Sequence, residues 1–251
     1  MRRLRPAVIG RTIRGVRTLH RVVGRTLPPE DASLLAGRQI VAVERWAKYQ
    51  LLQLDDGSAL EAHFRMAGDW AFGPTSTSHT LRHARAAIDL DDDSTVTLTD
   101  GRGFATLRRI PPGTPPPTRA PDALDAEFDA AYLARVLAGR RQAIKPTLLD
   151  QALIGGIGNI YASEALWQVR IDPRTPASRV GPRRVARLAL AIGETLTAAI
   201  AHPGRYAEGE ATDRLAVYDR EGEPCLRCGR AILRVVQSGR STYYCPGCQR
   251  R

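Results

Sequence analysis

Four cysteines near the end of the chain constrain its fold more than any other feature. Cys225 and Cys228 form one C-x-x-C pair, Cys245 and Cys248 form a second, and sixteen residues lie between the pairs. This spacing is typical of a tetrahedral four-thiolate zinc site, and it uses every cysteine of the chain. Two disulfides are the alternative, which the lack of a signal-peptide pattern disfavours. We therefore predict one structural zinc ion with these four thiolates as ligands.

The charge of the chain narrows the class of its partner. Lys and Arg number 37 against 26 Asp and Glu, which gives a formal charge of +11 and a pI near 10.2. Such an excess indicates a polyanionic partner, with nucleic acid as the first candidate, although an inert basic surface is the alternative. The sequence has no apolar run of membrane-spanning length, so we expect no membrane contact and a cytoplasmic location.

Hydrophobic periodicity divides the chain into parts. Residues 8–107 show short β-branched or alternating runs, at 40–43, 51–54 and 94–99, and predict a sandwich of strands. Six prolines within residues 110–122 predict a linker. Helical spacing follows in four segments, Asp125–Leu137, Pro146–Ile154, Tyr161–Val169 and Pro182–Ala201, with a glycine-rich turn at 155–159 between the second and the third. A hairpin of 232–236 and 242–244 would present Arg240 at its turn.

The predicted domains follow from these changes of pattern. They are a β-sandwich lobe over residues 1–110, a proline-rich linker over 111–122, a helical lobe over 123–203, and a loop with the zinc finger over 204–251. The glycine turn permits close helix packing, and free amides at the next helix start can hold a phosphate. Taken alone, the same segment is also compatible with a plain packing joint.

Several of these segments together carry a family resemblance. Lys145–Leu166 resembles the helix–two-turns–helix signature of the formamidopyrimidine-DNA glycosylase and endonuclease VIII family, and Val217–Gln249 resembles its C-terminal zinc finger. Arg3–Ile13, Ala47–Tyr49, His63–Gly68 and Asp100–Phe104 resemble its first helix, strand and wedge motifs. The resemblance covers residues 2–250 and implies an α+β fold with a β-sandwich lobe, a helical lobe and a zinc hairpin, with DNA between the lobes.

The resemblance also implies a function. Members of the family excise oxidised or ring-opened bases, such as formamidopyrimidines or 8-oxoguanine, from duplex DNA and cleave the strand at the abasic site. It implies a bacterial-type, nucleoid-associated monomer that binds damaged double-stranded DNA. A catalytically inactive damaged-DNA-binding paralogue is the first alternative. A zinc-ribbon protein that binds RNA or ribosomes is the second, and it rests on charge and cysteines alone.

Site residues follow from the matching motifs. Lys48 matches the residue that assists β-elimination, with a surface strand lysine as the alternative, and Arg240 matches the arginine that clamps lesion phosphates and assists δ-elimination, with a solvated turn arginine as the alternative. The remaining matches are predicted DNA contacts: the wedge residues Met66, Arg102 and Phe104, and the backbone contacts His83, Arg140, Lys145 and Asn159. Without the resemblance, Met66 and Phe104 would be assigned to a core.

The sequence departs from the family pattern in four places. The Met-Pro-Glu start that supplies the proline nucleophile is absent, and we expect a start codon assigned too late rather than an inactive paralogue. Gly103 stands where the family usually has a second arginine, and His83 is followed by Ala84 and Arg85 instead of acidic and histidine residues. The segment 204–214 is shorter than the usual lesion loop, which leaves the lesion preference open.

Overall fold

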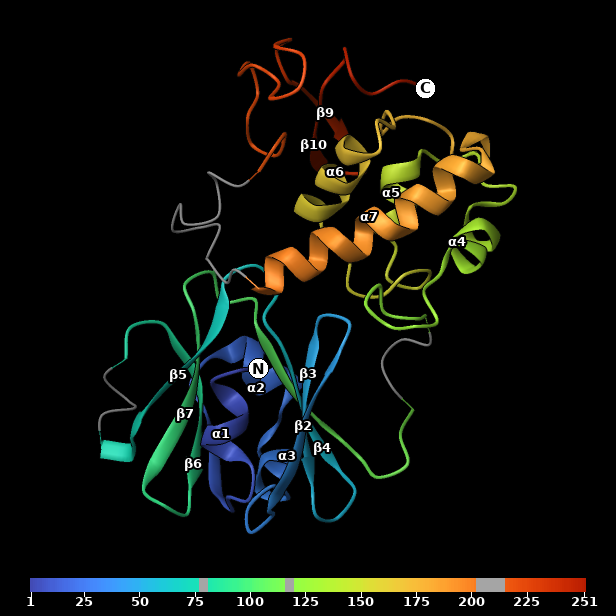
Figure 1. Cartoon of the computed structure of the whole chain (residues 1–251). Coiled ribbons are helices and arrows are strands. Elements are labelled where there is room, and N and C mark those ends of the chain that lie inside the picture. Colours follow the sequence, from blue (N-terminus) through green and yellow to red (C-terminus); the bar gives the residue numbers. More distant parts are fainter. Residues whose placement is uncertain (77–80, 116–119, 202–214) are drawn as a thin grey trace. The chain divides into compact units, whose positions relative to one another are not determined.

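The computed structural model describes residues 1–76, 81–115, 120–201 and 215–251. The chain divides into two compact units, Met1–Pro116 and Pro117–Arg251, drawn from blue to green and from green to red in Figure 1. Each unit has its own hydrophobic core. No helix in these described ranges is long and apolar enough to cross a lipid bilayer.

The first unit contains two four-stranded antiparallel sheets (Figure 1). One sheet has the order β1 (Ile13–Thr18), β6 (Ala84–Leu90), β7 (Ser94–Asp100) and β5 (Gly68–Pro74). The other has the order β2 (Ile40–Trp46), β3 (Tyr49–Leu54), β4 (Ala59–His63) and β8 (Thr106–Ile110). The described residues of this unit also form three short α-helices, α1 (Leu4–Val8), α2 (Arg21–Thr26) and α3 (Pro29–Ser33).

One core joins the two sheets of the first unit. Leu52 and Leu60 come from the second sheet and Ile88 and Leu98 from the first, and all four are fully buried in the same cluster. The helix α1 contributes Leu4 to this cluster. Burying apolar faces of two sheets against each other is what holds a sandwich together. The predicted β-sandwich is therefore confirmed, with short helices added to it.

The second unit is helical. Its helices are α4 (Ala130–Leu137), α5 (Ile144–Leu148), α6 (Asn159–Gln168), the short 3-10 helix η2 (Ala177–Arg179) and α7 (Pro182–Ala201). The bounds of α7 agree with the sequence prediction. The apolar residues on which that prediction was based form one buried stripe along the helix: Val185, Leu188, Ile192 and Leu196.

Two predicted helices differ from the structure at one end by five or six residues, and a third, expected over Tyr161–Val169, is found at Asn159–Gln168. The helix expected from Asp125 begins only at Ala130, because the Asp129 side chain accepts the Tyr132 backbone N–H at 2.6 Å and caps the first turn. The helix expected to reach Ile154 ends at Leu148, since Asp150 accepts the Ala152 N–H at 3.0 Å and stabilises turns instead.

The cysteine-bearing segment forms the predicted hairpin. Strands β9 (Leu233–Gln237) and β10 (Arg240–Tyr244) pair antiparallel, with Arg240 opposite Gln237. The two residues between them, Ser238 and Gly239, have φ of 48° and 73°, as a two-residue turn of the primed type requires. The predicted segment 204–214 lies outside the described residues, as does part of the predicted linker, 116–119.

Candidate functional site

The four cysteine sulfurs converge on one point. Their Sγ atoms all lie within 4.8 Å of one another. Cys225 Sγ is 3.9 Å from Cys248 Sγ, and Cys228 Sγ is 3.4 Å from Cys245 Sγ. Four thiolates about 2.3 Å from a central zinc ion lie at roughly these mutual separations.

Hydrogen bonding at the cluster also fits a metal. Backbone N–H groups of Arg227 and Cys248 each point at a sulfur, of Cys225 and Cys245 respectively, at 3.4 Å. Burial and the three neighbouring sulfurs raise the pKa of the Cys248 thiol to about 12, because so many thiolates cannot coexist without a cation. A zinc ion would replace these protons and clamp the ends of the hairpin, so its role is structural.

The helical unit holds the hairpin from one side through Lys145 and Asn159. Lys145 is 1% exposed, and its Nζ donates to the Ser241 carbonyl at 3.0 Å and to Thr242 Oγ1 at 2.8 Å. Asn159 Nδ2 donates to the same carbonyl at 3.0 Å and to the Tyr218 hydroxyl at 3.3 Å. The two residues predicted as DNA contacts are therefore brought together at the hairpin beside Arg240.

Glu164 holds the segment that leads into the zinc finger, a role that was not predicted from the sequence. Glu164 as a residue is 8% exposed, and its carboxylate accepts the backbone N–H groups of Ala216, Val217 and Tyr218 at 2.8 to 3.1 Å. Burial raises the pKa of this carboxyl, and the three N–H donors act against that rise. The available signal was a single acidic residue within an otherwise uncharged α6 sequence.

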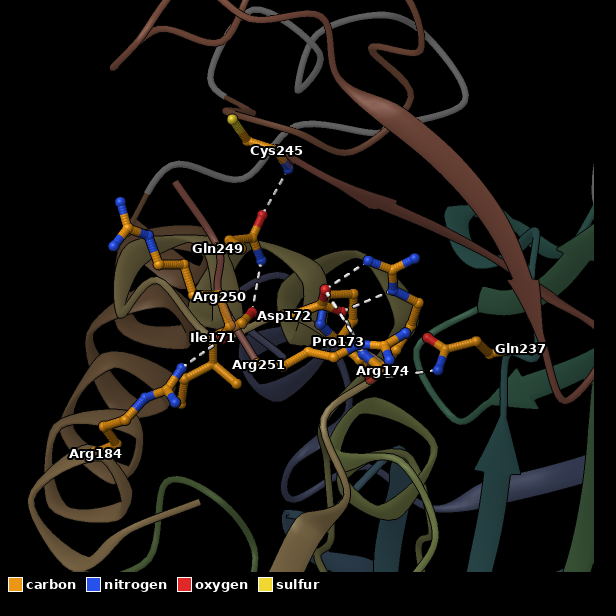
Figure 2. A network of polar contacts seen from close by, with 10 residues as sticks. All are labelled: Ile171, Asp172, Pro173, Arg174, Arg184, Gln237, Cys245, Gln249, Arg250 and Arg251. Carbon is orange, nitrogen blue, oxygen red and sulfur yellow. Dashed lines mark hydrogen bonds and ion pairs between the residues drawn. The ribbon is translucent and has the colours of Figure 1, made fainter. Parts of the chain in front are cut away.

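A second polar network ties the end of the chain to the segment after α6 (Figure 2). Gln249 bridges the Cys245 N–H and the Ile171 carbonyl, both at 2.8 Å. Asp172, 3% exposed, accepts both Nε and Nη2 of Arg174, at 2.9 and 2.6 Å. Figure 2 also shows Gln237 Nε2, which donates to the Pro173 carbonyl at 3.3 Å. The hairpin is thus held at several points.

In the first unit, a turn after β7 gathers the predicted wedge residues. Asp100 Oδ1 accepts the Arg102 N–H at 2.9 Å, and Oδ2 accepts those of Phe104 and Ala105 at 2.6 and 2.7 Å. These backbone hydrogen bonds lower the pKa of the Asp100 carboxyl in spite of its burial.

The three wedge side chains are exposed: Arg102 and Phe104 come from this turn, and Met66 comes from the turn between β4 and β5. Met66 is 71% exposed and Phe104 is 52% exposed. Arg102 lies between them, with Nη1 3.1 Å from Met66 Sδ and Cζ 5.5 Å from the Phe104 ring centre. The structure therefore brings the three together and excludes the alternative that Met66 and Phe104 belong to the core.

Two of the four departures from the family pattern lie beside the same turn. Gly103 has φ +70°, and a Cβ there would lie 3.0 Å from Cε1 of His20 and 3.9 Å from Cζ of Arg85. Arg85 Nε donates to the Asp100 carbonyl at 2.7 Å. His83, with φ 64°, is exposed at the start of β6. A histidine ring and a guanidinium therefore occupy the space next to the glycine.

Lys48 lies in the tight turn between β2 and β3. The preceding Ala47 has φ 51°, a left-handed conformation that turns the chain within two residues. Nearby, His63 packs edge-on against Tyr49 at 4.7 Å and accepts the Arg65 N–H through Nδ1 at 3.0 Å. Burial and the charges of Arg65 and Lys48 lower the pKa of His63 to about 4, so this imidazole is neutral beside the lysine.

Arg140 lies apart from the groups at the hairpin. Its Nε donates to the Val136 carbonyl at 2.6 Å, at the end of α4, and its side chain is exposed. Of the predicted residues, Lys145, Asn159 and Arg240 thus gather at the hairpin, and Met66, Arg102 and Phe104 gather beside the Asp100 turn. Lys48, His83 and Arg140 belong to neither group.

A β-sandwich unit of two four-stranded sheets and a helical unit that holds a hairpin with four clustered cysteines define the class of zinc-finger DNA glycosylases. Family profiles agree: residues 1–107 match the formamidopyrimidine-DNA glycosylase N-terminal domain, 119–208 its H2TH domain, and 222–251 the zinc finger found in FPG and IleRS. The formamidopyrimidine-DNA glycosylase of Chloroflexus aurantiacus is 41% identical over 99% of this chain and 94% of its own length.

Solved structures extend the similarity to the fold. The Lactococcus lactis formamidopyrimidine-DNA glycosylase bound non-covalently to DNA containing an AP site has a TM-score of 0.91 at 28% identity, over 100% of this chain and 96% of that chain. The MutM (Fpg) protein from Thermus thermophilus has a TM-score of 0.86 at 34% identity, over 99% and 95%. This chain belongs to the formamidopyrimidine-DNA glycosylase family, whose members are bifunctional glycosylases and abasic-site lyases.

Proposed function

We propose that this protein excises oxidised or ring-opened bases from duplex DNA and cleaves the strand at the abasic site, with Met66, Arg102 and Phe104 as its lesion wedge. The observation that carries the proposal is that these three side chains, from two neighbouring turns, are exposed and in contact with one another. Extruding a base leaves a hole in the stack and an unpaired partner. Two apolar groups fill the hole, and a guanidinium between them donates to the orphaned base.

Two cationic side chains assist strand cleavage in this proposal. Lys48 exchanges a proton during β-elimination, which an amine can do and a guanidinium cannot. The neutral His63 beside it adds no positive charge. Arg240 is exposed on the rigid hairpin, where it binds the phosphates next to the lesion and assists the second elimination.

The remaining contacts hold the DNA backbone. His83 and Arg140 bind phosphates directly, which gives an affinity that depends on salt and not on sequence. Asn159 must release the Ser241 carbonyl or the Tyr218 hydroxyl, to which its amide donates, before it binds a phosphate as well. The zinc ion supplies no chemistry to the reaction and keeps the hairpin folded. The protein acts as a monomer on chromosomal duplex DNA in the bacterial cytoplasm. Support comes from the Lactococcus lactis relative, which was solved on DNA with an AP site.

The wedge assignment is tested by lesion-selective binding. A duplex with one non-cleavable abasic analogue is compared with the undamaged duplex. Wild-type protein should prefer the analogue, and Met66→Ala with Phe104→Ala should reduce that preference by about 2 kcal/mol, or about thirtyfold. Leu190→Ala is the matched control, since Leu190 is 69% exposed on α7 and should leave the preference unchanged.

Three outcomes would contradict the proposed function. Equal affinity for damaged and undamaged duplexes would remove lesion recognition. Tighter binding to structured RNA would favour the zinc-ribbon alternative. A preference that survives the double substitution would show that other residues replace the extruded base.

A further inference from the structure

We propose that Lys145 is a positioning residue for Arg240, acting through the Ser241 carbonyl, and is not itself a DNA contact. This inference rests on the proposed function, because it concerns the residue that grips the lesion phosphates. Lys145 belongs to α5, and Thr242, one of the two residues its amine contacts, lies 97 positions further along the chain. The contact is therefore a tertiary one that connects the helical region to the hairpin.

The position of the amine leaves no room for a phosphate. Lys145 is 1% exposed, and its Nζ already donates to Ser241 and Thr242. Burial, together with the charge of Arg240, lowers the pKa of Lys145 to about 7. A lysine at the protein surface that meets DNA phosphates would be accessible to solvent, and this one is enclosed by protein.

The Ser241 carbonyl is a suitable point from which to control Arg240. Ser241 follows Arg240 directly, so fixing its peptide group fixes the direction in which β10 leaves the turn. The other side of the turn is held by Gln237, whose amide donates to Pro173 at 3.3 Å. Arg240 therefore sits between two anchored residues and keeps one backbone orientation.

The charge of Lys145 acts in the same direction. Below about pH 7, where the Lys145 amine is protonated, its ammonium and the Arg240 guanidinium interact as like charges. Repulsion disfavours rotamers in which Arg240 folds back onto the hairpin, and so leaves the guanidinium directed towards solvent, where an anionic ligand can meet it. Asn159 adds a second donor to the same carbonyl, at 3.0 Å.

A double-mutant cycle on the intact protein tests the inference. The variants are Lys145→Met, Arg240→Ala and both together, and the readout is affinity for the duplex with a non-cleavable abasic analogue. We expect Lys145→Met to weaken binding about tenfold, and to have no further effect once Arg240 is alanine. If the two losses multiply, Lys145 acts independently of Arg240 and the inference is wrong. A direct phosphate contact at Lys145 would also lower the slope of log K against log salt concentration by about 0.9 for each residue removed.

Two more variants separate positioning from loss of zinc and from a general loss of positive charge. Lys145→Gln is neutral and keeps a hydrogen-bond donor, so it should recover part of the Arg240-dependent affinity. If Lys145→Met loses its zinc, Lys145→Gln takes its place in the cycle. Recovery no better than Met would contradict the positioning role. Arg183→Met removes an exposed charge on α7, and its effect should add to that of Arg240→Ala. A wild-type protein with no preference for the abasic analogue would instead refute the proposed function.

Discussion

The carboxylate of Asp100 accepts the backbone N–H of Phe104 at 2.6 Å, and this bond helps to fix the turn that carries the exposed side chains of Arg102 and Phe104. We predict that Asp100→Asn destabilises the protein by about 2 kcal/mol, because an amide replaces a charged acceptor of several N–H groups. Urea unfolding measures the loss, and lesion-selective binding should fall with it. Unchanged selectivity would show that the turn holds its shape without the carboxylate.

The same carboxylate gives a pH dependence. Its pKa is lowered from 3.8 in the folded protein, so its stabilising contribution is present above that value and is lost as the pH falls through the folded pKa. The wild-type advantage over Asp100→Asn should therefore shrink at acidic pH, below about 4. An advantage that stays constant down to the lowest pH at which the protein is folded would contradict this assignment.

Gly103 offers a stability test at the position where the family usually has an arginine. Gly103→Ala should cost about 1 to 2 kcal/mol, because the residue has φ +70° and the new Cβ lies 3.0 Å from the His20 ring. In a His20→Ala background the loss should be smaller, since only the backbone strain remains. Urea unfolding measures both losses of stability. Equal losses in the two backgrounds would mean that the His20 ring moves aside for the new Cβ with no loss of stability.

The elements that the sequence predicted well are those with local signals. Helix α7 was placed correctly because its apolar residues recur every three or four positions, and the cysteine cluster followed from spacing alone. The end of α5 was missed, because the turn at Asp150 depends on a side chain that competes with the helix for a backbone N–H.

The contacts that could not be predicted are long-range. Glu164 binds backbone groups 52 to 54 positions away, and Lys145 binds Thr242 at a separation of 97. No local pattern indicates that a carboxylate will meet N–H groups of a distant segment, or that a lysine amine will be buried. Exposure of Met66 and Phe104 likewise depends on how the Asp100 turn packs.

Because its amine is buried, Lys145 should make the free energy of unfolding depend on pH in the alkaline range. Its pKa is lowered from 10.5 to about 7, so the folded state holds fewer protons than the unfolded state between these values, and stability should rise with pH across that interval. The burial penalty is fully present below about 7. Lys145→Met should lack this rise, and the difference between the two urea-unfolding curves isolates it. Parallel pH profiles would show that the amine is not buried in solution.

Zinc removal should change the fluorescence of Trp167. The guanidinium of Arg227, between the first two cysteines, stacks 3.8 Å from the Trp167 ring centre and donates to the Trp167 carbonyl at 3.0 Å. Chelation should free this loop, shift the indole emission and abolish DNA binding, and added zinc should restore both. Trp167→Phe identifies the signal among the three tryptophans. Metal loss without either change would contradict a structural zinc.

Base excision on a defined lesion tests the central claim most directly. The protein, carrying the N-terminus that it has in its own cells and verified by intact mass, is incubated in a chelator-free buffer without added magnesium, with an end-labelled duplex that contains one formamidopyrimidine. We predict release of the modified base and a strand break with phosphates at both ends, and Lys48→Ala should slow the break. An intact base on a duplex that the protein binds tightly would contradict the claim and identify a damage-binding protein without glycosylase activity.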